Sequence, residues 1–357
     1  MARTVAVRSA GREVDGPAGR ERAEVRRPTT IRDVAERAGV SVATVSKALN
    51  NRQHVRSETR DNVLRVAHEL NFAPNNLAQS LLSGRSGTVG LLTGDLVGRF
   101  SLPIMMGVED AFGAGSVSVF LCDARGDAIR ERHHLRALLS RRVDGLVVVG
   151  ASPDSRSSLG SELPVPVVYA YAPSDSASDI SIVTDNVAAG EQAARHLLDC
   201  GRRAIAYIAG DHSYSAARDR VAGATQVLSE AGQTLAGGSA LYGAWSEEWG
   251  RGATRTLLQR HPDLDGIVCG SDQIARGCLD VLHDLGRSVP ADIAVIGHDN
   301  WEPIAAHARP PLSTIDMELD TLGRRAAELL FRAIDGLVEP GIHSTTSRLV
   351  VRSSTVC

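Results

Sequence analysis

Residues 30–50 read TIRDVAERAGVSVATVSKALN, a pattern typical of two short helices joined at a single glycine. Thr30 can cap the first helix, with Asp33 three residues later as its partner in a capping box. Gly39 supplies the backbone freedom that a sharp turn needs, and Ser41 is placed to cap the second helix. The stretch therefore predicts a helix-turn-helix. Taken alone, it also fits a helical pair without a DNA-binding role.

The second helix of this pair separates apolar from outward positions by the spacing of a helix. Its inward positions are Val45, Ala48 and Leu49, and its outward positions are Val42, Ala43, Ser46 and Lys47. Outward residues near the start of such a helix meet the major groove of DNA. Lys47 can donate to guanine O6 or N7, whereas Val42 and Ala43 offer apolar contacts, for instance to thymine methyl groups.

A third helix is expected to begin after Ser57 as its cap, with Thr59, Arg60 and Arg65 available for phosphate contacts. Residues 71–81 then read NFAPNNLAQSL. This succession resembles the lactose-repressor (LacI/GalR) family of bacterial transcription regulators. The DNA-binding domain of that family reads T-I-x-D-V-A-x-x-A-G-V-S, then T-V-S-x-x-L-N, then T-R and L-x-Y-x-P-N-x-x-A. The resemblance runs from Thr29 to the C-terminus.

The resemblance implies a homodimer that binds double-stranded DNA at an inverted-repeat operator. It implies a hinge helix within residues 75–85 that folds in the minor groove, where Leu81 acts as a wedge between base pairs. Phe72 stands where the family usually has tyrosine. The DNA-contacting residues that we predict are Thr30, Ser41, Val42, Ala43, Thr44, Ser46, Lys47, Asn50, Thr59, Arg60, Asn75, Ala78, Gln79 and Leu81.

The charges of the chain are distributed unevenly. Residues 1–85 carry 15 basic against 9 acidic side chains, so the remainder must be strongly acidic to give the net charge of −3. A basic head on an acidic body is consistent with DNA binding by the head. Lys47 is the only lysine among 39 basic residues, which excludes a Walker A lysine and a Schiff-base lysine elsewhere.

Composition also bounds the class of protein. No apolar run is long enough for a membrane span, and residues 1–28 lack the apolar core of a secretory signal. We interpret residues 1–28 as a disordered basic arm, or as the product of a start codon placed too early. Five cysteines without CxxC spacing favour reduced thiols and a cytoplasmic protein. No metal site, no cofactor and no catalytic set is predicted, and the adjacent pair His133-His134 is interpreted as a solvated helix face.

From Thr88 onward, apolar runs alternate with amphipathic helical segments, which predicts an α/β body with parallel sheets. Expected helices lie at about 102–113, 128–141, 186–200, 215–232, 246–260, 272–285 and 320–335. Expected strands are 88–93, 117–122, 144–149, 165–169, 180–184, 204–209, 264–269, 292–297, 312–316 and 347–351.

The family resemblance implies that this body has two similar lobes, as in type I periplasmic binding proteins, and that it follows an N-terminal all-α helix-turn-helix domain in the chain. The predicted domains are the DNA-binding domain at 29–74, the hinge at 75–85 and the effector domain at 86–357. Within the effector domain, the N-lobe would comprise about 86–185 and 317–344, and the C-lobe about 186–316 and 345–357. The chain stops without a trailing heptad segment, so a dimer is expected rather than a tetramer.

A cleft between the two lobes is the expected ligand site, because open α/β sheets bind ligands at the carboxyl ends of their strands. Arg220 matches the arginine of the family's R-x-x-G, and Asp299 matches the aspartate of its G-[YF]-D-[ND], with His298 in place of the aromatic residue. Trp245 stands where sugar-responsive relatives have a stacking aromatic. The predicted effector-binding residues are Phe100, Tyr171, Arg220, Trp245, Ser271 and Asp299.

Two departures from the family pattern concern the predicted cleft. Ser271 replaces an asparagine of N-D-x-[IM]-A-x-G, and residues 98–101, reading GRFS, replace the common N-P-F-F. The overall expectation is a transcription regulator, most simply a repressor, controlled by a small molecule that is a sugar or, alternatively, a nucleobase. A transporter's solute-binding protein would lack residues 29–83, and an enzyme would need a catalytic set. The direction of control is not fixed by the sequence.

Overall fold

The computed structural model describes residues 29–49, 55–70, 72, 85–96, 98–112 and 117–356. Two compact units divide the chain, the first ending at Asn76 and the second starting at Leu77. The predicted arm at 1–28 and nearly all of the predicted hinge lie outside the described residues. Among the described helices, none is long and apolar enough to cross a membrane.

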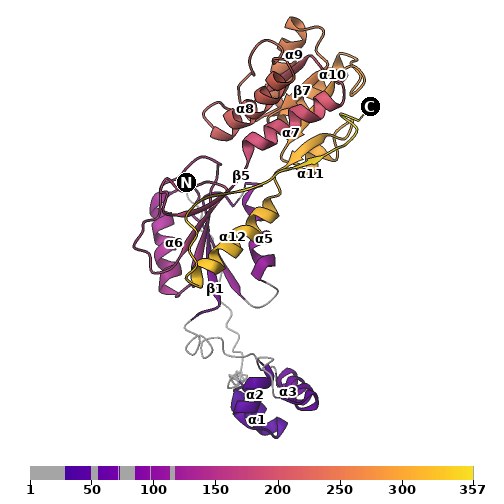
Figure 1. Cartoon of the computed structure of the whole chain (residues 1–357). Helices are drawn as coiled ribbons and strands as arrows, with labels where there is room; N and C mark the ends of the chain where they lie inside the picture. The colour runs from indigo at the N-terminus through magenta and orange to yellow at the C-terminus, as the bar shows by residue number, and fades with distance from the viewer. Residues whose placement is uncertain are drawn as a thin grey trace, which may run out of the picture. The chain divides into compact units, whose positions relative to one another are not determined.

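The first unit is a bundle of three short helices, α1 (Ile31–Ala38), α2 (Val42–Leu49) and α3 (Ser57–Glu69) (Figure 1). Each helix contributes a fully buried valine to one small core: Val34, Val45 and Val63. The predicted capping box is present, because the Thr30 side chain accepts the backbone N–H of Asp33 and the Asp33 side chain accepts that of Thr30.

The turn between α1 and α2 also follows the sequence pattern. Gly39 ends α1 with φ 66°, in the left-handed region, and the Ser41 hydroxyl caps α2 by accepting the backbone N–H of Thr44 at 3.1 Å. The predicted cap of α3 is wrong. Ser57 is the first residue of α3, and Arg56 occupies the cap position without a side-chain hydrogen bond. One residue of shift is enough to remove the cap, because the hydroxyl must precede the helix to reach its free N–H groups.

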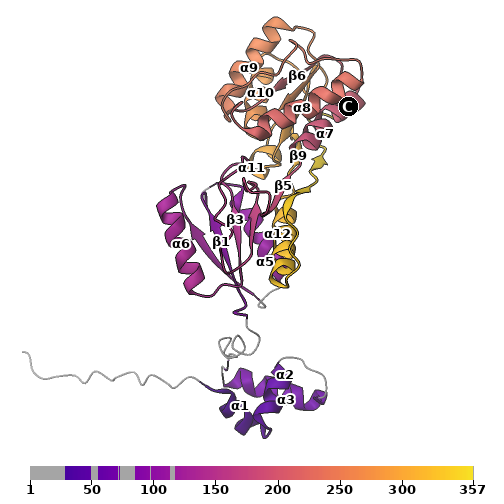
Figure 2. The ribbon, with the colours of Figure 1, turned by 60° about the vertical axis from the view of Figure 1, so that its left-hand side comes forward.

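The second unit contains two sheets, and the first is a parallel sheet of six strands in the order β10-β5-β4-β3-β1-β2. Helix α6 covers one face of this sheet, and α5 and α12 cover the other (Figure 2). The bounds are β1 Thr88–Thr93, α5 Ser101–Phe112, β2 Ser118–Asp123, α6 Ala128–Ser140, β3 Gly145–Val149, β4 Val167–Ala170, β5 Ile180–Thr184, α12 Leu319–Ile334 and β10 Gly341–Thr345.

The second sheet has five strands in the order β11-β9-β8-β7-β6, and only β11 is antiparallel to its neighbour. Helices α7 and α8 pack on one face, while α9 and α10 pack on the other. The bounds are α7 Asn186–Asp199, β6 Ile205–Ile208, α8 Ser215–Glu230, α9 Glu247–Arg260, β7 Gly266–Cys269, α10 Asp272–Asp284, β8 Ala294–His298, α11 Glu302–Ala305, β9 Ser313–Asp316 and β11 Arg348–Val350.

The cores follow from continuous apolar strands that are covered on both faces. Residues 146–149, reading LVVV, are fully buried, because their side chains alternate between the two covered faces of the first sheet. The α/β fold with parallel sheets is therefore confirmed. The chain passes between the two sheets after β5, after β9 and after β10.

Two elements were not predicted from the sequence. Strand β10, reading GIHST, lies at the edge of its sheet, and Thr345 is its only buried residue, so its composition lacks the apolar run of a central strand. Helix α11 is a single turn after Trp301, too short to show a helical period.

Candidate functional sites

The exposed face of α2 carries the side chains predicted to meet DNA bases. Val42, Ala43 and Lys47 are exposed, and Val42 keeps 41% of its surface accessible although it is apolar. An exposed apolar residue at the start of a capped helix is suited to contact with the major groove. Of the remaining predicted DNA contacts, Thr30 and Ser41 serve as helix caps, and Thr44, Ser46, Thr59 and Arg60 are half-buried on α2 and α3.

The other predicted DNA contacts lie outside the described residues: Asn50, Asn75, Ala78, Gln79 and Leu81. They stay predictions from the family resemblance.

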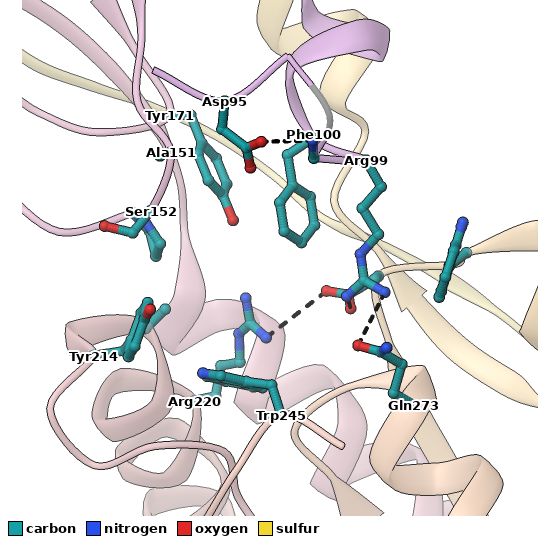
Figure 3. Close-up of a pocket in the computed structure, with 15 residues that line it drawn as sticks. Asp95, Arg99, Phe100, Ala151, Ser152, Tyr171, Tyr214, Arg220, Trp245 and Gln273 are labelled. Carbon is teal, nitrogen blue, oxygen red and sulfur yellow. Dashed lines mark hydrogen bonds and ion pairs between the residues drawn. The ribbon is translucent and has the colours of Figure 1, made fainter. Parts of the chain in front are cut away.

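The second unit holds a cavity of about 380 Å³ bounded by segments that follow the strands of both sheets. Asp95, Ala151 and Tyr171 follow strands of the first sheet, and Asp299 follows β8 directly. This is where ligands of parallel α/β proteins bind. The cavity is lined by Asp95, Gly98, Arg99, Phe100, Ala151, Ser152, Pro153, Tyr171, Tyr214, Ala216, Arg220, Trp245, Gln273, Asp299 and Trp301 (Figure 3).

Arg220, in the second turn of α8, is a buried cation held in place by several acceptors. Its Nε donates to Asn186 Oδ1 at 2.8 Å, and its Nη1 donates to the carbonyl oxygen of Gly270 at 2.8 Å. Its Nη2 is 3.9 Å from the sulfur of Met317, a weak acceptor. The Arg220 side chain is only 5% exposed, and its Nη2 has only a weak acceptor. This nitrogen can therefore donate a hydrogen bond to a ligand in the cavity.

Asp299 places a buried carboxylate opposite Arg220, as the sequence predicted for the cleft. Its side chain is 4% exposed, and its Oδ1 lies 4.0 Å from Arg220 Nη1. The backbone at Asp299 has φ 106°, a conformation that few residues other than glycine adopt, so the surrounding structure holds the carboxylate in this direction. Burial raises the pKa of Asp299, and the two nearby guanidinium groups of Arg99 and Arg220 oppose that shift.

Arg99 is a site residue that the sequence analysis did not select. Its Nη2 forms an ion pair with Asp299 Oδ2, and its Nη1 is 3.5 Å from Gln273 Oε1. The guanidinium also lies 4.7 Å from the ring centroid of Phe100 and 4.7 Å from that of Trp301. Rings on two sides and a carboxylate at the end fix the plane and position of this cation.

Five aromatic side chains line the cavity beside these charged groups. Phe100 stacks on Tyr171 with ring centroids 5.3 Å apart, and Tyr214 meets Trp245 edge to face at 5.8 Å. Gly210 allows the approach of Trp245, because a Cβ there would lie 2.3 Å from the indole ring. The cavity therefore gathers five of the thirteen aromatic residues of the chain. Such walls suit flat ligands and the C–H faces of sugars.

Ser271 lies outside the cavity lining. It is fully buried and caps α10, where its hydroxyl accepts the backbone N–H of Ile274 at 3.3 Å. Its neighbour Asp272 accepts hydrogen bonds from the Thr314 hydroxyl at 2.6 Å and from the backbone N–H of Trp301 at 2.7 Å. This second bond fixes the start of the Trp301 segment beside Arg99. Burial raises the pKa of Asp272 to about 8.

His298 ends β8 and is buried behind the cavity, where its Nε2 has no partner among the described residues. Burial lowers its pKa well below the ordinary value, and the charges of Arg220 and Arg99 act in the same direction. The imidazole therefore packs as a neutral ring in the position where the family pattern has an aromatic residue.

The structure brings together five of the six predicted effector residues: Phe100, Tyr171, Arg220, Trp245 and Asp299. Sequence reasoning missed Asp95, Arg99, Tyr214, Gln273 and Trp301. A signal for two of them was available, because Arg99 belongs to the segment that departs from the family pattern and Trp301 follows Asp299 by two residues. No grouping of His, Cys, Asp or Glu in the described part of the chain could hold a metal ion.

A helix-turn-helix unit followed by a two-sheet body with a strand-end cavity defines a class: ligand-responsive DNA-binding regulators. Comparison with known proteins agrees. A family model described as bacterial regulatory proteins, lacI family, matches residues 30–75, and a periplasmic binding protein-like domain matches residues 194–355. The chain belongs to the lacI family of bacterial regulatory proteins and is a DNA-binding transcription regulator.

Three known proteins illustrate the likeness over nearly the whole chain. The ribose operon repressor of Halalkalibacterium halodurans is 32% identical over 92% of this chain and 97% of its own length. The transcriptional repressor PurR of Glaesserella parasuis is 32% identical over 91% of this chain and 98% of its own. A structure of the Lac repressor dimer bound to operator and the anti-inducer ONPF has a TM-score of 0.70 at 28% identity, covering 93% of this chain and 100% of that chain.

Proposed function

We propose that this chain is a homodimeric repressor that binds an inverted-repeat operator and is controlled by a sugar-like effector in the cavity. One observation carries the proposal: the same chain presents an exposed α2 face and a cavity that contains the buried Arg220–Asp299 pair. The proposed role is regulatory and not enzymatic, as for the other regulators of this family. We expect a cytoplasmic location, because the operator DNA lies there.

The DNA-binding half of the proposal rests on α2 and on the segment after α3. Lys47 would read guanine edges, and Val42 and Ala43 would contact thymine methyl groups. Two copies of the unit would read two half-sites related by a twofold axis. Leu81, at the predicted hinge, would insert at the central base step of the operator and bend it.

The effector-binding half rests on the pairing of polar and aromatic walls. Arg220 would donate to an effector oxygen, and Asp299 would accept from effector hydroxyl groups. Trp245 and Phe100 offer ring faces on which a sugar ring can pack. This combination of a few fixed polar groups with apolar walls is typical of small-molecule sites.

Control would follow from contacts that join the two sheets across the cavity. Arg99, from the segment after β1, bonds Asp299 after β8, and Asp154, after β3, accepts the backbone N–H of Ser215 at the start of α8 at 2.8 Å. A ligand that alters these contacts changes the relative stability of open and closed arrangements. Effector affinity and operator affinity are then reciprocally coupled.

A nucleobase is the second candidate effector, favoured by the stacked pair Phe100–Tyr171. A base could lie against these rings while Asp299 accepts its N–H groups. The two candidates differ in chemistry and are separated by direct binding measurements.

The test has two steps. First, bound DNA is selected from a random pool with the purified full chain; recovery of an inverted repeat supports the dimeric DNA reader, and recovery of an asymmetric half-site or of no consensus contradicts it. Second, neutral sugars, sugar acids and nucleobases are screened for a change in affinity for the selected operator. Loss of operator affinity indicates an inducer, and a gain indicates a corepressor. A protein that binds its operator but responds to no compound contradicts the effector half.

A further inference from the structure

The cavity wall around Asp299 carries more positive than negative charge. Arg99 bonds one oxygen of the carboxylate, and Arg220 lies 4.0 Å from the other, so two cations share one anion. The two titratable groups behind the wall do not add negative charge at neutral pH. Burial raises the pKa of Asp272 to about 8 and keeps His298 neutral by lowering its pKa.

Asp95 is the other acidic residue of the cavity lining, and its side chain stabilises the loop that contains it. Its Oδ1 accepts the backbone N–H of Gly98 at 2.6 Å, and Figure 3 places it beside Tyr171, on the far side of Phe100 from the Arg99 guanidinium. It therefore orders the segment that carries Arg99 instead of pairing with either arginine. The wall formed by Arg99, Arg220 and Asp299 keeps an excess positive charge that faces the cavity.

Both guanidinium groups are oriented for an acceptor before a ligand arrives. Arg99 lies 4.7 Å from the ring centroids of both Phe100 and Trp301 and is 21% exposed, and Arg220 has Nη2 opposite the weak sulfur acceptor of Met317. Planar guanidinium groups bind carboxylate and phosphate oxygens with two parallel hydrogen bonds. A neutral hydroxyl would have to compete with the Asp299 carboxylate for Arg99, whereas an anionic group would supply the missing charge.

We infer that the effector is an acidic sugar whose anionic group lies between Arg99 and Arg220 and whose ring packs among the cavity aromatics. This inference rests on the proposed function and narrows its ligand class. The shared chemistry is an oxyanion on a polyol, which a carboxylate or a phosphate ester supplies equally. In this arrangement Arg99 determines specificity, because it adds the second cation to a wall that Arg220 and Asp299 alone would leave neutral.

The experiment compares acidic sugars with their neutral counterparts on the full chain by isothermal titration calorimetry. The pairs are glucuronate and glucose, galacturonate and galactose, and glucose 6-phosphate and glucose, so that carboxylate and phosphate are tested separately. At least one acid should bind ten- to a hundredfold more tightly than its neutral partner, the range expected for hydrogen bonds to charged groups.

The Arg99→Gln variant should lose that preference, because the glutamine amide is polar but carries no charge. Arg260→Gln removes one charge from an exposed position on α9 and should keep the preference. Binding of only neutral sugars, or an acid preference that survives in Arg99→Gln, overturns the inference and leaves the proposed function standing. Failure of all these sugars to bind also overturns it. Operator binding, measured on the same samples, then shows whether the regulator itself is intact.

Discussion

The carbonyl oxygen of Arg220 lies against Gly190, so closely that a Cβ on that glycine would be 1.9 Å from it. The contact is reciprocal, since a Cβ on Gly223 of α8 would lie 2.0 Å from the carbonyl oxygen of Val187 on α7. The two helices that meet here are α7, which also supplies Asn186 to the Arg220 guanidinium, and α8, which carries Arg220 itself. Helix packing and the position of the buried cation are therefore set by the same contact.

Gly190→Ala should destabilise the body, because the new methyl group forces α7 and α8 apart. Overpacking of this kind typically costs about 1–3 kcal/mol. Gly252→Ala is the matched control, since a Cβ on this helical glycine of α9 meets nothing within 4 Å and should stabilise α9 by up to about 1 kcal/mol. Urea unfolding at a fixed protein concentration measures both. Equal stability of the Gly190→Ala variant and the wild type would show that the contact relaxes without cost.

Much of this architecture could be predicted from the sequence, because local signals agreed with the fold. Thr30, Gly39 and Ser41 act through hydrogen bonds within four residues, so their roles are visible in a short window. Buried strands such as 146–149 are predictable because every residue in them is apolar. The prediction of Ser57 as a cap was wrong because a cap requires the exact first residue of the helix, and helical periodicity does not fix that residue.

The site was less accessible to sequence reasoning, because its residues meet only after folding. Arg99 and Asp299 are 200 positions apart, and nothing local to either residue indicates the ion pair. Arg220 and Asp299 were recognised through family motifs, not through their own surroundings. Ser271 was predicted to contact the ligand, because its family motif suggested such a contact. Its buried hydroxyl instead caps α10.

His298 should make the free energy of unfolding of the body decrease at acid pH. Its folded pKa lies below the ordinary value of about 6.5, so the folded state binds the proton less readily than the unfolded chain. The stability linked to this residue is therefore complete above about pH 6.5 and is lost as pH falls toward the folded pKa, by at most about 1.4 kcal/mol per pH unit.

The His298→Phe variant, which restores the aromatic residue of the family pattern, should lose stability less steeply than the wild type between pH 7 and 5. The exposed His133 serves as control, and His133→Phe should keep the wild-type slope. Unfolding free energies at several pH values give the slopes. Parallel curves for His298→Phe and wild type would mean that the buried imidazole is not the source of the acid sensitivity.

Lys47 is exposed on the face of α2 that we propose to enter the major groove. Lys47→Ala should relax base preference at one symmetric pair of operator positions and cost roughly 1–3 kcal/mol per half-site. Operator variants at each position, measured by fluorescence anisotropy, show the effect. If Lys47 contacts only phosphate, every sequence weakens alike and the salt dependence drops by about one unit per contact.

Asp299 and Arg220 allow effector response to be separated from DNA binding. At Asp299 the proper substitution is asparagine, because φ 106° would strain alanine, whereas asparagine tolerates positive φ better than most residues. Asp299→Asn removes a charged acceptor for the hydroxyl groups of the effector and the anchor that orients Arg99, and Arg220→Gln removes a buried donor set. Each should weaken effector binding roughly ten- to a hundredfold, the scale of a lost hydrogen bond to a charged group.

Operator affinity without effector should stay near the wild-type value in both variants, because the DNA-binding unit is a separate compact part of the chain. The expected result is a regulator that occupies its operator and no longer responds to its ligand. Anisotropy titrations with and without effector, combined with thermal melting, distinguish the cases. Full effector response in either variant removes that residue from the site. A loss of operator binding together with a lower melting temperature would show that the residue stabilises the fold of the body. This outcome is conceivable for Asp299→Asn, because burying Arg220 without a counter-charge destabilises the folded state.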